Sequence, residues 1–448
     1  MAFNSLEKKA LSGLAVLYAS RMLGLFMVLP VLAVSGQSLT GATAQTLGIA
    51  LGIYGATQAM LQLPLGALSD RYGRKPVMLA GLLVFLLGSV VAALAEHVLV
   101  LILGRALQGA GAIAAVILAL LADYTREAER TKAMAVIGAT IGASFVVAVM
   151  VGPVLAQWGG LSAVFWATAA LALVSMVVVL RLPVPPPARR HADRRWRSEH
   201  LQRILFSWHL MPLTLGVFVL HLVLVALFVG LPLQLQSLGL SDDQLSWVYA
   251  PIMIFAFIGM LPLIIMAERN KAHRFFMSLA ALMIAVAAIG MGLNDRLLMT
   301  LGLIWLFFVG FNLLEATLPS LVSRYAPTSA RGTAMGIFST GQFLGAAVGG
   351  VVGGWLYAHY QMEGIAWLSG LLMLAWIALF QGARSKVREW VVPAALADDN
   401  LLQQRVEQLE KLEGVYQARF EKQSNQVVWS VVARPNALDQ ESLEAQLR

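Results

Sequence analysis

The stretch Gly66-Ala-Leu-Ser-Asp70-Arg71-Tyr-Gly73-Arg74-Lys75 joins two long apolar runs and is the most informative part of this sequence. It combines two glycines, which permit tight backbone geometry, with one acidic and three basic residues. The flanking runs belong to a set of twelve, each of about 20 residues, the length that crosses the hydrocarbon core of a bilayer. We therefore expect a short loop at one membrane surface, between the second and third spans.

The composition is that of a polytopic membrane protein. The 448 residues are 59% hydrophobic and 12% charged, with a mean hydropathy of +0.75. In lipid only helices and closed barrels satisfy the backbone, and continuous rather than alternating apolar runs favour helices. The expected spans are 10–34, 45–68, 76–95, 98–122, 132–156, 161–182, 209–235, 244–267, 275–293, 297–321, 332–358 and 364–382.

The basic residues predict the orientation of the spans. If the amino terminus is cytoplasmic, 23 Lys and Arg lie in cytoplasmic segments, and Arg296 alone lies on the opposite side. The positive-inside rule then places both termini in the cytoplasm. The net charge of +8 is thereby explained by topology rather than by nucleic-acid binding. Lys8 and Lys9 precede a full-length run, which suits an uncleaved first span rather than a secretory signal.

The spans divide into two repeated halves, 1–182 and 209–382, which are joined by a cytoplasmic linker at 183–208 rich in Pro and Arg. Five residues of the first half recur 201 positions later: Tyr124, Arg130, Ala133, Met134 and Gly152 as Tyr325, Arg331, Ala334, Met335 and Gly353. Parallel repeats of six-span halves are typical of transporters, which bind their solute between the halves.

Residues 390–448 are polar and mildly acidic, and they form a separate segment. The expected elements are a strand at 390–392, a helix capped by Asp398 to Asn400 and stopped by Gly414, a hairpin of 415–420 and 426–432, and a last helix that begins at Asp439. The order βαββα is similar to a ferredoxin-like domain without its closing strand. The chain has no cysteine, so no metal is expected there.

Several stretches resemble motifs of the major facilitator superfamily. The loop 66–75 matches the signature between spans 2 and 3, and residues 101–111 resemble the motif of span 4. Gly152-Pro153 stands where span 5 of the antiporters carries a Gly-Pro pair, although alanines replace the glycines usual around it. Over residues 10–382 the chain resembles the proton-driven drug antiporters of that superfamily. Its tail makes it similar to the YajR-type group.

The resemblance implies that the loop acts as a conformational switch. Asp70 would face the amino end of span 11 near 332–335, where free N–H groups favour an anion, and Arg74 would pair with Asp123. The alternative is a loop that only orients charges and packing. The residues assigned to this switch are Gly66, Asp70, Arg71, Gly73, Arg74 and Asp123. Helix packing is expected at Gly152, Pro153, Gly341, Gly345 and Gly349.

Four ionisable residues lie inside predicted spans: Arg21, Arg105, His221 and Glu315. Buried charges are costly in a membrane and by default functional. The resemblance implies that their spans, 1, 4, 7 and 10, line a central cavity. Glu315 is the candidate proton carrier, and the alternative is a carboxylate permanently paired with an arginine. Further candidates for contact with solute are Gln58, Gln62, Gln108, Gln234 and Asn312.

The resemblance thus predicts an all-α membrane protein of twelve helices in two pseudo-symmetric six-helix halves, with a small cytoplasmic α+β domain. We expect a monomeric proton-coupled exporter of small amphipathic solutes in the bacterial inner membrane. The proton gradient would drive it, since the chain has no phosphate-binding loop, and neither a cofactor nor a metal is expected. The alternatives are an importer of organic anions and a membrane sensor whose tail binds a cytoplasmic partner. No catalytic constellation favours an enzyme.

Overall fold

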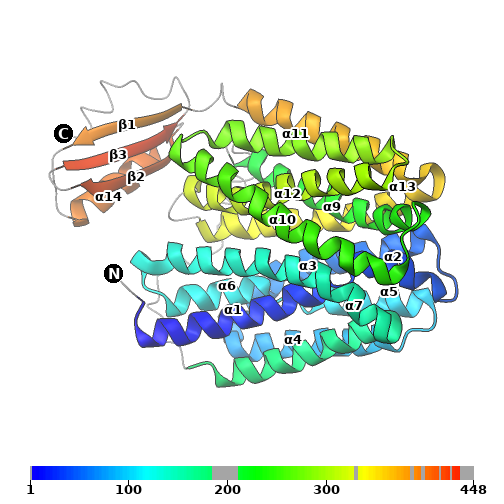
Figure 1. The fold of residues 1–448 in the computed structure, drawn as a ribbon. Coiled ribbons are helices and arrows are strands. Elements are labelled where there is room, and N and C mark those ends of the chain that lie inside the picture. Colours follow the sequence, from blue (N-terminus) through cyan, green and yellow to red (C-terminus); the bar gives the residue numbers. More distant parts are fainter. Residues whose placement is uncertain are drawn as a thin grey trace. The chain divides into compact units, whose positions relative to one another are not determined.

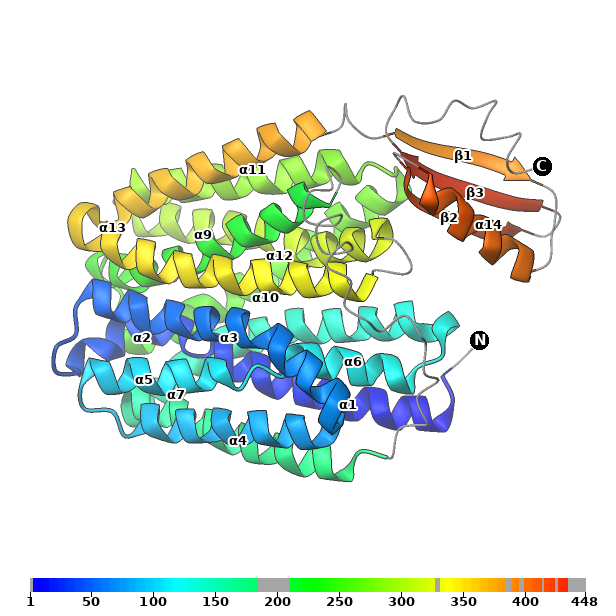
Figure 2. The same cartoon turned by 180° about the vertical axis from the view of Figure 1, so that it is seen from behind.

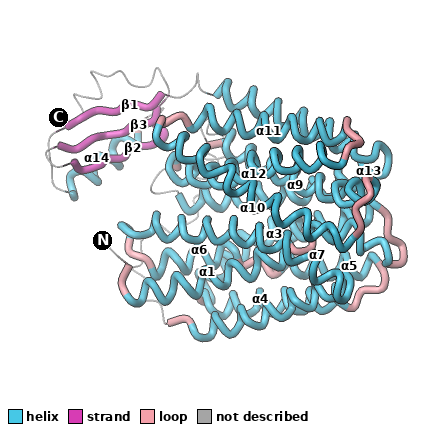
Figure 3. Tube along the Cα trace, viewed as in Figure 1, coloured by secondary structure: helices cyan, strands magenta, loops and turns pink. Residues whose placement is uncertain are grey.

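A computed structural model describes residues 3–183, 210–326, 331–383, 388–394, 399–412, 415–423 and 426–433. These residues form long helices and one small sheet (Figures 1 and 3). The predicted linker at 183–208 and the predicted last helix after Asp439 lie almost entirely outside the described residues.

The first half consists of helices that follow the predicted spans closely. Their bounds are α1 Ser5–Phe26, α2 Leu29–Ser35, α3 Ala44–Tyr72, α4 Arg74–Ala93, α5 Val98–Ala110, α6 Ala114–Tyr124 and α7 Glu127–Arg181. Two predicted spans are each divided into two helices. Pro30 begins α2 after a break at 27–28, and the segment 111–113 separates α5 from α6.

The second half has helices α9 Met211–Ser237, α10 Asp242–Arg269, α11 His273–Gly292, α12 Leu297–Tyr325 and α13 Arg331–Gly382. The two longest helices, α7 and α13, are each interrupted. Gly160 has φ 64° and ψ −160° inside α7, and Gln361 has φ 51° and ψ −147° inside α13. These breaks are 201 residues apart, the spacing of the sequence repeat, so the repeat extends to backbone conformation.

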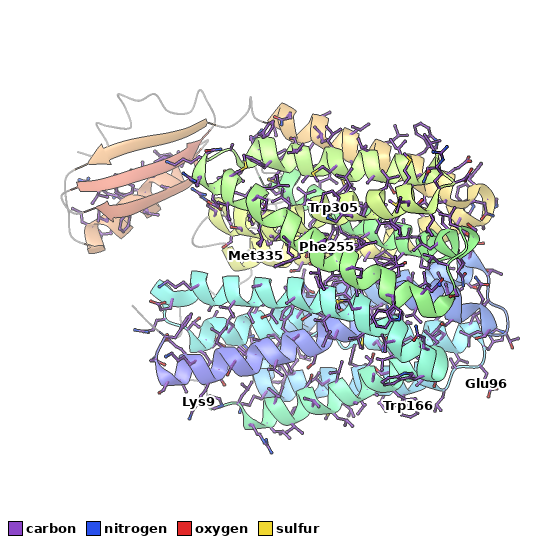
Figure 4. The ribbon with its side chains drawn as sticks, in the orientation of Figure 1. Lys9, Glu96, Trp166, Phe255, Trp305 and Met335 are labelled. Atoms are coloured by element: carbon purple, nitrogen blue, oxygen red, sulfur yellow. The ribbon has the colours of Figure 1, made fainter. Side chains whose placement is uncertain are left out.

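The outer faces of the helices are apolar, as lipid contact requires. Within the described residues, nine helical segments are long and apolar enough to cross a membrane. Phe255 and Trp305, on α10 and α12, are 61% and 39% exposed, and Trp166 on α7 is 47% exposed (Figure 4). Such exposure of large apolar side chains suits a hydrocarbon solvent. The chain is therefore a multi-pass membrane protein.

Helices α3 and α13 meet along a contact that we call the glycine seam: Gly48 and Gly52 of α3 against Gly350 and Gly354 of α13 (Figure 2). A Cβ atom on Gly350 would lie 2.6 Å from the Gly52 nitrogen, and one on Gly354 would lie 2.7 Å from the Ala44 oxygen. Only glycine permits this backbone approach. The seam therefore joins the two repeated halves near the amino-terminal end of α3, remote from the loop 66–75, and in the part of α13 that precedes its break at Gln361.

The residues after 387 form a small α+β unit. Strands β1 Arg388–Ala394, β2 Val415–Gln423 and β3 Gln426–Ala433 make an antiparallel sheet in the order β1-β3-β2, with α14 Asp399–Lys411 between β1 and β2 in sequence. Leu402 and Leu409 of α14 pack with Trp429 in the core of this unit. The first four predicted elements are thus present, in the predicted order.

Candidate functional site

Three polar side chains from three helices of the second half meet at the centre of the apolar segments. The Gln342 amide nitrogen (α13) lies 2.8 Å from Nε2 of His221 (α9) and 3.3 Å from Oε1 of Glu315 (α12). His221 Nε2 lies 3.7 Å from the other carboxylate oxygen of Glu315. The His221 side chain is 4% exposed and that of Glu315 is 22% exposed. We call these three residues the proton cluster.

The hydrogen bonds of His221 define its tautomer. Its Nδ1 lies 3.1 Å from the Val217 carbonyl oxygen, which can only accept, so Nδ1 carries a hydrogen. In the neutral ring Nε2 is then an acceptor, and Gln342 donates to it. A second proton, on Nε2, would turn this acceptor into a donor. Nε2 could then no longer accept the hydrogen bond from the Gln342 amide. The hydrogen bonds of the cluster are therefore those of an imidazole that carries its hydrogen on Nδ1.

Arg21 and Arg105 are buried in a separate group within the first half. Arg21 donates to the Gly111 carbonyl oxygen and to Tyr54 Oη at 3.2 Å, while Arg105 lies over the Tyr54 ring with its CZ atom 4.8 Å from the centroid. Their exposed fractions are 2% and 0%. Among the described residues neither forms an ion pair with a carboxylate. The four ionisable residues therefore form two groups, and Glu315 has no arginine partner there, contrary to the alternative interpretation of a permanent pair.

Two of the predicted amide residues belong to the arginine group, and a third lies elsewhere in the second half. Gln58 accepts a bond from Arg21 at 3.4 Å, and Gln108 accepts one from Arg105 at 2.9 Å. Gln234 donates to the Met291 carbonyl oxygen at 2.6 Å. Several of their buried atoms have no protein partner: Gln58 Nε2, Gln62 Oε1, Gln234 Oε1 and Asn312 Nδ2. These atoms retain unused capacity for hydrogen bonds, while Gln108 serves mainly to hold Arg105.

The loop 66–75 contains the predicted ion pair. Arg74 lies 3.2 Å from Asp123 Oδ2 and 2.6 Å from Asp70 Oδ1, and Arg74 and Asp123 are each 11% exposed. Gly73 separates α3 from α4 with φ 95°, a conformation that favours glycine. The expectation for Gly66 is wrong, because α3 continues to Tyr72 and the nearest atom to a Cβ there would be 3.8 Å away. The contact of Asp70 with 332–335 stays a prediction.

The predicted packing glycines contact neighbouring backbones. Cβ atoms on Gly345 and Gly349 of α13 would lie 2.8 Å from backbone atoms of α9. Gly152, followed by Pro153 within α7, packs in the same way against the Met27 backbone where α1 ends. Gly341 lies on α13 at the same spacing and is half-buried. These glycines hold helices together within each half, whereas the glycine seam joins the halves.

Aromatic rings surround the proton cluster and connect the two halves. Phe145 of α7 lies 5.4 Å from Phe311 of α12 and 4.9 Å from Phe26 of α1, between ring centroids. Phe311 in turn lies 6.0 Å from the His221 ring. Offset and edge contacts of this kind stabilise aromatic pairs. The polar cluster is thus set against an aromatic wall formed by both halves.

A cavity of about 320 Å³ lies beside the glycine seam. It is lined by Leu47 and Leu51 of α3, Val229 and Leu233 of α9, and Tyr357 of α13, with Gln37 and Thr43 as its polar residues. Within the described residues no group of three or more His, Asp or Glu is placed to hold a metal ion.

Sequence reasoning missed two residues of these groups. Gln342 was not among the predicted amides, because a single glutamine in a glycine-rich helix has no distinguishing pattern. Tyr54 was missed because an aromatic residue in an apolar helix is ordinarily part of the core. Its position one turn before Gln58 on a face toward span 1 was the available signal.

Repeated sets of apolar helices, close glycine packing and buried polar groups between apolar segments are typical of a membrane transporter. The family model of the Major Facilitator Superfamily matches residues 14–333 and 213–438, so the chain belongs to that family of secondary transporters and is not an enzyme. It is 40% identical over 425 residues to the inner membrane transport protein YajR of Escherichia coli (strain K12), with 93% of each chain covered.

Two further matches are more distant. The chain is 26% identical over 363 residues to the multidrug resistance protein MdtH of Yersinia pestis (strain Pestoides F), covering 79% of this chain and 90% of that protein. A solved structure of a bacterial homologue of the human lysosomal transporter Spinster, in an inward-facing and occupied conformation, matches with a TM-score of 0.69 at 14% identity. That match covers 86% of this chain and 98% of the other, and it shows a shared fold.

Proposed function

We propose that this protein is a proton-coupled secondary transporter that exports small amphipathic organic solutes by alternating access. The observation that carries the proposal is the environment of Glu315. Its carboxylate lies in the apolar centre of the second half, is partly accessible, and accepts a hydrogen bond from the neutral amide of Gln342. His221 Nε2 lies 3.7 Å away, and no arginine of the described residues pairs with the carboxylate. A carboxylate without a fixed cation can take up and release a proton.

Twelve spans are part of the proposal. Nine segments qualify as candidates, and two of these, Lys132–Arg181 and Thr333–Gly382, are 50 residues long and contain the breaks at Gly160 and Gln361. Each of the two is long enough for two crossings. Helix α3, at 29 residues, would provide the remaining span. With both termini cytoplasmic, the glycine seam lies on the outer side of the membrane and is closed in this structure.

An amphipathic solute is favoured by what surrounds the carboxylate. Phe145 and Phe311 provide an apolar wall next to His221 and Glu315, so an aromatic or lipophilic group and a polar or cationic group could be held together. The similarity to a protein named for multidrug resistance supports export of such molecules. The bacterial inner membrane is supported by the similarity to YajR, which is named as an inner membrane protein.

Import of an organic anion is the second candidate. Arg21 and Arg105 would provide positive charge for an anion, and no carboxylate of the described residues neutralises them. Both guanidinium groups are nevertheless buried against Tyr54 and bonded to protein acceptors, at 2% and 0% exposure. A solute could reach them only after the first half rearranged. The geometry therefore favours proton exchange at Glu315 over anion binding at the arginines.

The C-terminal unit, which we propose to be of the ferredoxin-like type and cytoplasmic, is an accessory domain. Its core around Trp429 is formed by apolar side chains of α14, β2 and β3. A sensor whose output passes through this unit is the rival interpretation. Removal of residues 388–448 separates the two, because transport should persist if the unit is accessory.

The proposal is tested by proton movement in inside-out vesicles that contain wild type or Glu315→Gln. The panel of solutes is a lipophilic cation, a neutral drug and an organic anion. Solute-evoked proton release from the acidified lumen, lost in the variant, is the expected result for antiport through Glu315. Thr317→Val, which removes a buried hydroxyl bonded only to its own helix, is the control for local packing.

Two results would contradict the proposal. Unchanged proton flux in Glu315→Gln with retained transport would show that this carboxylate is structural. Movement of protons into the vesicle lumen together with the organic anion would instead establish proton–anion symport, the mechanism of the import alternative.

A further inference from the structure

We infer that Gln342 is a positioning residue that connects the protonation state of His221 and Glu315 to the opening of the glycine seam. The inference rests on the proposed proton coupling. A change in protonation of His221 or Glu315 would change the hydrogen bonds of the Gln342 amide and thereby displace α13. Gln342 itself binds neither the proton nor the solute.

The Gln342 amide nitrogen lies between two hydrogen-bond acceptors. One nitrogen of Gln342 serves two acceptors on two other helices, His221 Nε2 at 2.8 Å and Glu315 Oε1 at 3.3 Å. Both bonds require a neutral imidazole and an unprotonated oxygen on Glu315. A proton on His221 Nε2 removes the first acceptor, and a proton on Oε1 of Glu315 removes the second. Either event leaves the amide with one acceptor fewer and favours its rotation or withdrawal.

Gln342 and half of the glycine seam lie on the same helix, α13. The same helix carries Gly350 and Gly354, which form the seam with α3 two to three turns further along. Ala347, between the amide and the seam, already contacts Gly52 through its carbonyl oxygen. A close-packed helix moves as a rigid body, so a displacement at Gln342 is transmitted to the seam. The contacts of Gly345 and Gly349 with α9 provide the surface along which α13 slides or tilts.

The surroundings of the cluster leave the pair His221 and Glu315 as its titrating groups. On α1, Tyr18 lies within electrostatic range of both Glu315 and Arg21. Tyrosine and arginine keep the same charge between acid and neutral pH, whereas histidine and a buried carboxyl do not. The ring of Phe311 separates His221 from the first half. A pH-dependent change at the seam would therefore originate in the proton cluster.

The experiment measures the seam directly and needs no solute. The chain contains no cysteine, so Gln45→Cys on α3 and Ala358→Cys on α13 place a single pair of spin labels across the seam, at two exposed positions. Distances between the labels are recorded by double electron–electron resonance in nanodiscs across a pH series. The compared proteins are the doubly labelled parent, the same protein with Gln342→Met, and the control with Thr317→Val.

In the parent, acidification is expected to increase the population with the longer distance. One net hydrogen bond corresponds to about a fivefold change in the ratio of two states. Gln342→Met, which retains the length of the side chain but has no amide, should give a population independent of pH, and Thr317→Val should follow the parent. Gln342→Leu repeats the test if the methionine variant does not fold.

Two other outcomes overturn the inference and are distinguishable. If Gln342→Met follows the same pH curve as the parent, Gln342 does not couple the cluster to the seam, and the proposed function is unaffected. If the parent itself shows no change with pH, protonation does not control the seam. The proposal of proton-coupled alternating access then fails together with the inference.

Discussion

The glycine seam allows a prediction whose magnitude follows from the structure. In Gly350→Ala the new Cβ atom would lie 2.6 Å from the Gly52 nitrogen, whereas ordinary contacts begin at 3.4 Å. The Gly48 carbonyl oxygen would be closer still, so α3 and α13 must separate by more than about 0.8 Å, and the obstacle is backbone, which cannot rotate away. Overpacking of this kind destabilises by about 1–3 kcal/mol. Because the seam exists only in the closed state, the closed-to-open ratio should fall about 5- to 150-fold.

The assay is the distance distribution between labels at positions 45 and 358, measured in Gly350→Ala at constant pH. Gly302→Ala on α12 is the matched control, because nothing lies within 4 Å of a Cβ atom there. Gly302→Ala should behave as the parent does, and Gly350→Ala should show a longer-distance population. A folded Gly350→Ala with an unchanged distribution would refute the reasoning, since the seam would then accept a methyl group without opening.

Three further changes have expected outcomes. Arg74→Ala removes the ion pairs of Arg74 with Asp70 and Asp123, which are half-buried. The free energy of unfolding should fall by more than the ~1 kcal/mol typical of an exposed pair and by less than the ~3–5 kcal/mol typical of a buried one. A lower melting temperature would report this loss, and the control Arg269→Ala, at an exposed position, should leave the melting temperature unchanged. Glu7→Gln weakens the hydrogen bonds that Arg126 donates to the Glu7 carboxylate, which is 1% exposed. In the same melting assay the variant should be less stable by about 2–3 kcal/mol. Equal melting temperatures of Glu7→Gln and the exposed control Glu96→Gln would contradict this expectation. Trp429→Ala should lower the free energy of unfolding of the C-terminal unit by about 3–5 kcal/mol and make this unit sensitive to proteolysis. Solute-evoked proton release should persist in this variant. Loss of that release would favour the sensor interpretation.

Much of the fold was predictable because apolar runs are a strong signal. Span positions follow from run length, and the loop 66–75 was recognisable because glycine and charge occur there at fixed spacing. The breaks between helices were harder to predict. The division of the first span at 27–28 precedes Pro30, a visible signal, whereas Gln361 adopts a positive φ that no property of glutamine favours. The place of that break, between the predicted spans 332–358 and 364–382, did follow from the gap between two apolar runs.

The candidate site was predictable by residue type but not by arrangement. Arg21, Arg105, His221 and Glu315 stood out because charges in apolar helices are rare, but no sequence pattern indicated how they group. Grouping depends on which face of each helix each residue occupies, and a helix that is apolar all round carries no such information. The two arginines therefore turned out to share Tyr54, while the other two residues share Gln342.

The departures from the repeat show where the two halves differ in their polar residues. At the spacing of 201 residues, Glu315 corresponds to Ala114 and Gln342 corresponds to Ile141. The first half therefore has apolar residues at the positions where the second half has a carboxylate and the amide bonded to it. Gly350 corresponds to Val149, which is fully buried, so α7 lacks this seam glycine and presents a side chain at that position. Under the proposed function, halves that differ at these positions do not contribute equally to proton exchange. The second half would supply Glu315 and the helix α13 that carries Gln342, and the first half would supply the surface against which that helix closes.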